Sequence, residues 1–171
     1  MDVILGATGQ VGSQVVNRLL EAKKIVRVIG RSPERLASLA VKGAIPLVGD
    51  IADTDFLIRA FEGATGVFVM VPPNGQAEDL RSYQKKIVRS IADALKEAKV
   101  TRTFSLSCVG ADLEEGTGPV RGHHLLEDKL NRIKRLNIIH FRAACFMENI
   151  LWHIGSMRSQ GIIGAALRGD L

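Results

Sequence analysis

The feature that most constrains the fold is a glycine-rich segment near the N-terminus, Gly6-Ala7-Thr8-Gly9-Gln10-Val11-Gly12. It follows the apolar stretch Val3-Ile4-Leu5 and precedes an apolar pattern with helical spacing. A buried strand, a glycine turn and a helix N-terminus in this order suit a diphosphate, because backbone N–H groups and the positive end of the helix dipole face the ligand. The segment therefore predicts nucleotide binding by Gly6, Thr8, Gly9, Gln10, Val11 and Gly12, although a bare turn with the same glycines is the alternative.

Strand and helix patterns alternate along the rest of the chain. After the first strand we expect strands near residues 25–29, 45–48, 66–71, 103–107 and 138–141. We expect helices near residues 11–24, 32–40, 53–61, 79–98, 121–136 and 146–157. Strands separated by single helices predict a Rossmann-type, doubly wound parallel α/β sheet with right-handed crossovers and helices on both faces.

Length and composition indicate one globular domain spanning residues 1–171. The apolar fraction of 46% and the charged fraction of 24% are those of an ordinary globular protein. No apolar run approaches the roughly 20 residues that cross a bilayer, so we expect a cytoplasmic protein without a membrane partner. Cys108 and Cys145 lack the spacing of a metal site or a redox pair, and we expect no metal and two buried structural thiols.

The formal net charge of +5 raises the question of nucleic-acid binding. The basic residues are spread over several expected helices, for example Lys23 and Lys24, Lys85 and Lys86, and Arg132. They are not interleaved with aromatic residues, which are few in this chain. A solvated surface explains them, so we expect no nucleic-acid partner.

In a sheet of this kind the ligand lies over the carboxyl ends of the strands. Arg31 follows the second strand, and Arg35 lies one helical turn later. A carboxylate would select NAD(H) here, whereas these guanidinium groups favour the 2′-phosphate of NADP(H), unless Arg31 is only a surface residue. Asp50 follows the third strand and either accepts a hydrogen bond from adenine or caps a turn. The fourth strand ends in a set expected to border the nicotinamide-side ribose, Met70, Val71 and Pro72.

Further motifs extend the pattern to nearly the whole chain: Val48-Gly49-Asp50, Val71-Pro72-Pro73, Ser107-Cys108-Val109-Gly110-Ala111, Glu127 with Leu130, and Phe146-Met147-Glu148-Asn149. With the glycine segment, they make the chain resemble the NmrA-like branch of the atypical short-chain dehydrogenases/reductases, in particular bacterial NAD(P)H:quinone oxidoreductase-like members. The resemblance implies NADP(H) or NAD(H) on the Rossmann half and a substrate cleft capped by a smaller C-terminal part. Relatives continue well beyond the equivalent of residues 161–171, so the resemblance also implies that the capping part is missing here.

The sequence departs from this superfamily at the catalytic acid. Typical relatives carry a Tyr-x-x-x-Lys pair, and anchoring on Glu127 places the lysine position at His123 and the tyrosine position at Pro119. The strand-end serine survives as Ser107, although Cys108 is an alternative occupant of that place. His123 or His124 could reach the nicotinamide pocket as a weak donor or a ribose contact, or could be exposed residues at a helix start.

Loss of the acid favours an NADPH-dependent reductase of quinones or similar small electrophiles, because a strong acceptor takes hydride and solvent completes the protonation. The alternative is a noncatalytic NADP(H)-sensing regulator that acts through a protein partner. An isomerase or epimerase is less favoured, because such chemistry depends on the absent acid. The sequence does not identify the substrate. It also leaves the oligomeric state undetermined, with a homo-oligomer among the alternatives.

Overall fold

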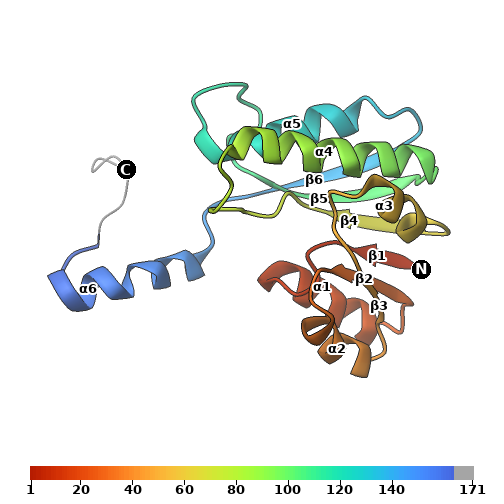
Figure 1. Ribbon diagram of the computed structural model, residues 1–171, viewed down its shortest axis with the longest axis horizontal. Helices are drawn as coiled ribbons and strands as arrows, with labels where there is room; N and C mark the ends of the chain where they lie inside the picture. The colour runs from red at the N-terminus through yellow and green to blue at the C-terminus, as the bar shows by residue number, and fades with distance from the viewer. Residues whose placement is uncertain (164–171) are drawn as a thin grey trace.

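The computed structural model describes residues 1–163 and contains a six-stranded sheet (Figure 1). Its strands are β1 (Asp2–Ile4), β2 (Val26–Gly30), β3 (Ile45–Val48), β4 (Gly66–Val69), β5 (Arg102–Cys108) and β6 (Asn137–Ala143). Every neighbouring pair is parallel, and the strand order is β3-β2-β1-β4-β5-β6. The order reverses between β1 and β4, which confirms the predicted doubly wound Rossmann-type sheet.

The helices are α1 (Gln10–Glu21), α2 (Pro33–Val41), α3 (Thr54–Phe61), α4 (Leu80–Glu97), α5 (Arg121–Asn131) and α6 (Ile154–Gln160), with 3₁₀ turns η1 (Gly118–Val120) and η2 (Met147–His153). Local side-chain bonds fix several of their starts. The Ser32 hydroxyl accepts from the Arg35 N–H at 3.2 Å, and the Asp53 carboxylate accepts from the Phe56 N–H at 3.0 Å. Both side chains therefore act as N-caps.

Two apolar cores hold the helices to opposite faces of the sheet. One core packs α3, α4 and α5 against β4 and β5, with Phe61, Ile91 and Leu126 fully buried. The other packs α1 and α2 against β1 and β2 through Val16 and Leu36. Figure 1 shows the two layers on either side of the strands. Within residues 1–163, no helix combines the length and the apolar character that crossing a membrane requires.

The predicted C-terminal boundary at residue 136 was wrong, because helix α5 ends at Asn131. Arg135 has φ +67°, a left-handed conformation that a right-handed helix does not accommodate. The helix expected at residues 146–157 was also wrong in form, since the 3₁₀ turn η2 precedes α6. Residues 164–171 lie outside the described part.

Candidate functional site

The glycine segment forms a tight turn between β1 and α1. Gly6 has φ +64°, and its carbonyl accepts from the Gly9 N–H at 3.0 Å. Gly9 is the N-cap of α1, with no side-chain cap bond and no acidic residue in the first turn of the helix. A helix leaves its first N–H groups without intrahelical partners, so those of α1 are available to an anion.

Gly12 brings the start of α1 close to this turn. A Cβ atom there would lie 2.2 Å from the Gly6 carbonyl oxygen, far inside van der Waals contact. Only glycine therefore allows the helix to sit so near the turn, which is the packing that a dinucleotide-binding turn requires. The local structure fits a bound diphosphate.

The two predicted arginines lie differently with respect to this turn. The Arg35 guanidinium Nη2 lies 3.5 Å from the Thr8 carbonyl oxygen, and both residues line a hollow of about 220 Å³ beside the turn. Arg31 is exposed at the end of β2. Asp50 accepts from the Ala52 N–H at 2.9 Å, so the turn-capping interpretation is seen in the structure. A bond from Asp50 to adenine stays a prediction.

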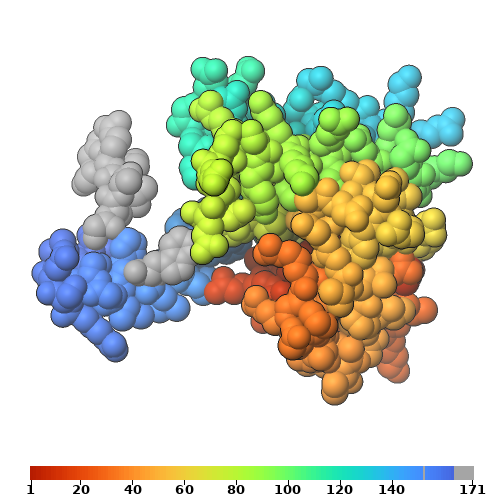
Figure 2. All heavy atoms as spheres, in the orientation of Figure 1, coloured from red at the N-terminus to blue at the C-terminus, as the bar shows by residue number. Residues whose placement is uncertain are grey.

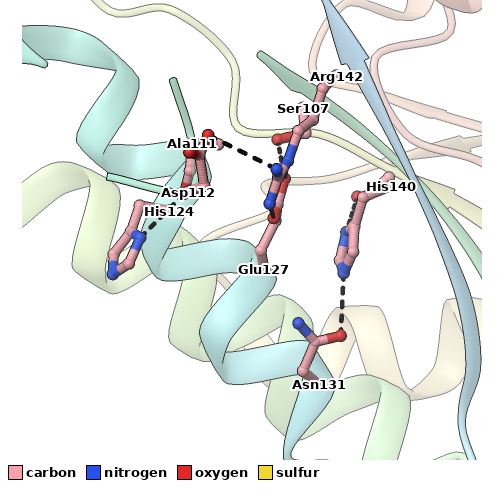
Figure 3. Close-up of polar contacts among 9 residues, drawn as sticks. Ser107, Ala111, Asp112, His124, Glu127, Asn131, His140 and Arg142 are labelled. Carbon is pink, nitrogen blue, oxygen red and sulfur yellow. Dashed lines mark hydrogen bonds and ion pairs between the residues drawn. The ribbon is translucent and has the colours of Figure 1, made fainter. Parts of the chain in front are cut away.

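A cavity of about 560 Å³ opens at the carboxyl ends of β4, β5 and β6. It is lined mainly by apolar residues and includes the predicted set Met70, Val71 and Pro72. Ser107 and His123 also line it. His124 does not, because its Nδ1 atom lies 2.9 Å from the Ala111 carbonyl oxygen (Figure 3). Of the three catalytic candidates, the structure thus brings two together in one cavity.

The cysteines were predicted to be buried structural thiols, and that prediction was wrong. Both line the cavity: Cys108 at the end of β5 is partly exposed, and Cys145 beyond β6 is exposed. The Asn149 side-chain amide donates to the Cys145 sulfur at 3.4 Å. The expectation of burial rested on the absence of metal-site or redox-pair spacing, which says nothing of exposure, and strand ends at the carboxyl edge of this sheet open into a cavity. Among the described residues, no group of three or more acidic, histidine or cysteine side chains could hold a metal ion.

A buried carboxylate, that of Glu127, accepts the hydrogen bond that the Ser107 hydroxyl donates (Figure 3). Ser107 donates to Oε1 of Glu127 at 2.5 Å, and Arg142 donates to both carboxylate oxygens at 3.0 and 2.6 Å. Burial raises the pKa of Glu127, but the bonds from Arg142 and Ser107 outweigh it and leave the pKa below its ordinary value. Glu127 is therefore ionised at neutral pH, and the hydroxyl proton of Ser107 is held in the hydrogen bond to it.

His123 lies on α5 next to this network. Its Nδ1 atom is buried and has no hydrogen-bond partner among the described residues. Burial lowers the pKa of His123, and the Leu106 carbonyl and the Glu127 charge oppose that shift only in part. The imidazole is therefore neutral at pH 7, which makes it a poor proton donor.

Sequence reasoning missed Arg142, the partner that holds Glu127. The sixth strand was expected to end at Phe141, whereas β6 extends to Ala143 and places Arg142 opposite Ser107 in the sheet register. Extending the strand by two residues would have revealed the pairing, because adjacent parallel strands carry registered residues side by side.

Comparison with known proteins agrees with this geometry. Residues 6–137 match the family model described as NAD(P)H-binding. A (4-alkanoyl-5-oxo-2,5-dihydrofuran-3-yl)methyl phosphate reductase from Streptomyces griseus is 28% identical over 99% of this chain and 56% of its own length. An NmrA-like family domain-containing oxidoreductase from Aspergillus hancockii is 31% identical over 86% of this chain and 47% of its own.

A solved structure shares the fold. The NADPH-dependent quinone oxidoreductase of Escherichia coli, complexed with NADPH, superimposes with a TM-score of 0.78 at 23% identity, covering 94% of this chain and 55% of that one. The chain thus spans about half the length of the relatives that it matches. The family match covers most of the chain, including the glycine turn and the strands that surround it. This chain therefore belongs to the NAD(P)H-binding family and is a homologue of the NmrA-like oxidoreductases.

Proposed function

We propose that the chain is the nucleotide-binding part of an NADPH-dependent reductase that acts on a quinone or a similar flat electrophile. The observation that carries the proposal is the apolar cavity of about 560 Å³ at the carboxyl ends of β4, β5 and β6. No lysine, tyrosine or carboxylate lines it among the described residues. An apolar cavity without an acid suits a planar substrate that accepts hydride unaided.

The residues of the chain have separate tasks in this proposal. The free N–H groups at the start of α1 bind the diphosphate, and Arg35 beside Thr8 holds the 2′-phosphate. NADPH, when bound, supplies the hydride. The apolar walls around Met70 and Pro72 orient the acceptor and limit the access of water to it. Residues 1–171 act as one NAD(P)-binding domain.

The cavity lacks a strong proton donor, which favours an activated acceptor. The Ser107 hydroxyl donates its proton in a hydrogen bond to Glu127, and neutral His123 is a weak acid. General acid catalysis is worth roughly 10²- to 10⁴-fold, and an unactivated ketone would lose that factor here. A quinone takes hydride without it, and solvent supplies the proton. The relatives named for quinone and dihydrofuranone substrates support the same class of acceptor.

The experiment that tests the proposal follows NADPH oxidation by absorbance with a small quinone and with a simple ketone. The proposal expects turnover with the quinone and at least about 100-fold less with the ketone. The matched pair of variants is Arg35→Ala, which should raise KM for NADPH, and Arg89→Ala, an exposed arginine on α4 that should leave it unchanged. Comparable turnover of both acceptors would contradict the proposed acceptor class.

A second function is favoured by the same missing acid: a noncatalytic sensor that binds NADP(H) and signals through a protein partner. Tight binding of both cofactor forms without turnover of any acceptor would support it over the reductase. A partner affinity that changes between NADP⁺ and NADPH would complete that case.

A further inference from the structure

Gln84 on α4 is a buried amide that borders the candidate active cavity. It is 6% exposed and lines the cavity of about 560 Å³ together with Pro119 and His123. Its Nε2 atom donates a hydrogen bond to the Pro119 carbonyl oxygen at 2.8 Å. A carbonyl oxygen only accepts, so this bond fixes the orientation of the amide and leaves Oε1 as an acceptor for another group.

The Gln84 side chain packs tightly against the start of α5. A Cβ atom at Gly122 would overlap Nε2 of Gln84 and lie 2.5 Å from its Cδ atom, so glycine leaves the room that the amide occupies. In Figure 2 the atoms of α4, in green, lie against those of the segment that leads into α5, in blue-green. The contact is made by α4, η1 and α5 and does not involve the segment after β6. The amide therefore has a fixed place in the cavity wall.

The Oε1 atom of Gln84 is available to a ligand. No described residue donates a hydrogen bond to it, and it is not sealed from solvent. The open space that Gln84 borders is the cavity. Polar atoms in buried positions are paired with protein groups, water or ligand. A ligand without a donor that displaced water from Oε1 would leave this acceptor unpaired, whereas a ligand with an N–H or O–H group would pair it.

We propose that Gln84 selects, among flat electrophiles, those that carry an N–H or O–H group, because Oε1 accepts a hydrogen bond from that group. The inference rests on the proposed reductase function and names the substrate class within it, namely quinones or related acceptors with an amino or hydroxyl substituent. Gln84 is then a specificity-determining residue that contacts the acceptor, while NADPH supplies the hydride.

Two other amides of the cavity lining are less suited to this role. Asn74 and Asn149 are only partly buried, so water competes for their hydrogen bonds. Oδ1 of Asn74 already accepts from the Gln76 N–H at 3.2 Å, and Nδ2 of Asn149 donates to the Cys145 sulfur at 3.4 Å. A buried acceptor with no other partner discriminates more strongly between ligands with and without a donor.

The test compares two quinones that differ in one substituent, 2-amino-1,4-naphthoquinone and 2-methyl-1,4-naphthoquinone. The amino and methyl groups are similar in size, and only the amino group donates a hydrogen bond. Dissociation constants are measured by calorimetric titration of the 171-residue chain with NADP⁺ present, so that the different reactivities of the quinones do not enter. The quantity compared between variants is the ratio of Kd for the methyl quinone to Kd for the amino quinone.

Gln84→Leu removes the acceptor and should lower this ratio by roughly 2- to 13-fold, the value of one hydrogen bond, through weaker binding of the amino quinone. Gly122→Ala retains Gln84 but displaces its amide, so the ratio should fall in the same direction. Gln14→Leu is the matched control, because Gln14 is exposed on α1 and lies outside the cavity lining. It should leave the ratio at the wild-type value.

An unchanged ratio in folded Gln84→Leu would overturn the inference, even if both quinones bind more weakly, because equal losses mark a residue that only holds α4 to η1. Urea unfolding of the same samples shows whether each variant is folded. If Gln84→Leu does not fold, the ratio in Gly122→Ala decides in the same way.

Oxidation of NADPH by the methyl quinone is recorded separately, so that the two proposals fail independently. Turnover with an unchanged ratio would refute the role of Gln84 and leave the reductase in place. A lowered ratio in Gln84→Leu without turnover of either quinone would support the contact with Gln84 and contradict the reductase. Absence of binding by both quinones would overturn the inference as well.

Discussion

Replacing Gly12 with alanine should weaken both the fold and cofactor binding. The added Cβ would lie 2.2 Å from the Gly6 carbonyl oxygen, 2.8 Å from the Gly6 carbonyl carbon and 3.0 Å from the Ala7 Cα. Ordinary contact begins near 3.4 Å, so α1 and the turn must separate by about 1.2 Å. Overpacking of this kind costs about 1–3 kcal/mol in the free energy of unfolding. Alanine in a helix otherwise stabilises by up to about 1 kcal/mol, so the expected sign is the reverse of helix propensity.

The same shift moves the helix N–H groups away from the diphosphate. Loss of one hydrogen bond to a charged group is worth about 1.5–3 kcal/mol, or roughly a 10- to 150-fold rise in Kd. Calorimetric titration with NADPH and urea unfolding measure the two effects. Gly155→Ala is the control, since a Cβ on that helical glycine meets nothing within 4 Å. If Gly12→Ala binds NADPH as tightly and unfolds at the same urea concentration as Gly155→Ala, the close-packing argument is refuted.

Three further outcomes follow from the charged and polar groups. Arg35→Ala should raise Kd about 10-fold or more for NADPH but little for NADH, by titration, whereas Arg89→Ala should change neither; equal losses for both cofactors would count against 2′-phosphate recognition. Glu127→Gln should cost about 1–2 kcal/mol in urea unfolding at pH 7. Because the pKa of Glu127 is lowered in the fold, its contribution is present above the ordinary value of 4.5 and disappears as the pH falls through the folded pKa, so the gap between variant and wild type should narrow as the pH falls below 4.5; a constant gap would contradict an ionised Glu127. The pKa of His123 is lowered by burial, so the unfolded chain binds the proton more readily and stability falls as the pH drops below 6.5. His123→Gln should remove this part of the decline between pH 7.5 and 5.5, measured by thermal unfolding, and His124→Gln should retain it; identical profiles would contradict the lowered pKa of His123.

The sequence was sufficient for the architecture because the fold depends on local patterns. The glycine turn, the caps at Ser32 and Asp53 and the continuously apolar β4 each leave a signature in neighbouring residues. Each β–α unit is then joined to the next parallel strand by a right-handed crossover. Strand order and helix placement follow from these local signals.

The candidate site was predicted in part, because its polar network is nonlocal. Ser107 and Glu127 are 20 residues apart, and Arg142 reaches Glu127 from a third element. No local spacing encodes that triplet; it follows from the register of β5 and β6. The exposure of Cys145 depends likewise on the direction that the chain takes beyond β6, which hydropathy does not fix.

One face of the sheet is bare over β5 and β6, and it was missed for a related reason. Helices do lie on both faces of the sheet, but periodicity does not say how far each helix extends across it. α1 covers β1 and β2, while Phe104 and Phe141 on β5 and β6 stay exposed on that side.

The most direct test of a diphosphate site at the glycine turn is a titration of the ¹⁵N-labelled chain with NADPH, followed by backbone amide resonances. The account predicts that the largest shifts arise at Gln10, Val11 and Gly12, with a further change at Arg35 that NADH does not reproduce. Saturable shifts confined to other elements, or no shifts in this segment at millimolar NADPH, would contradict it.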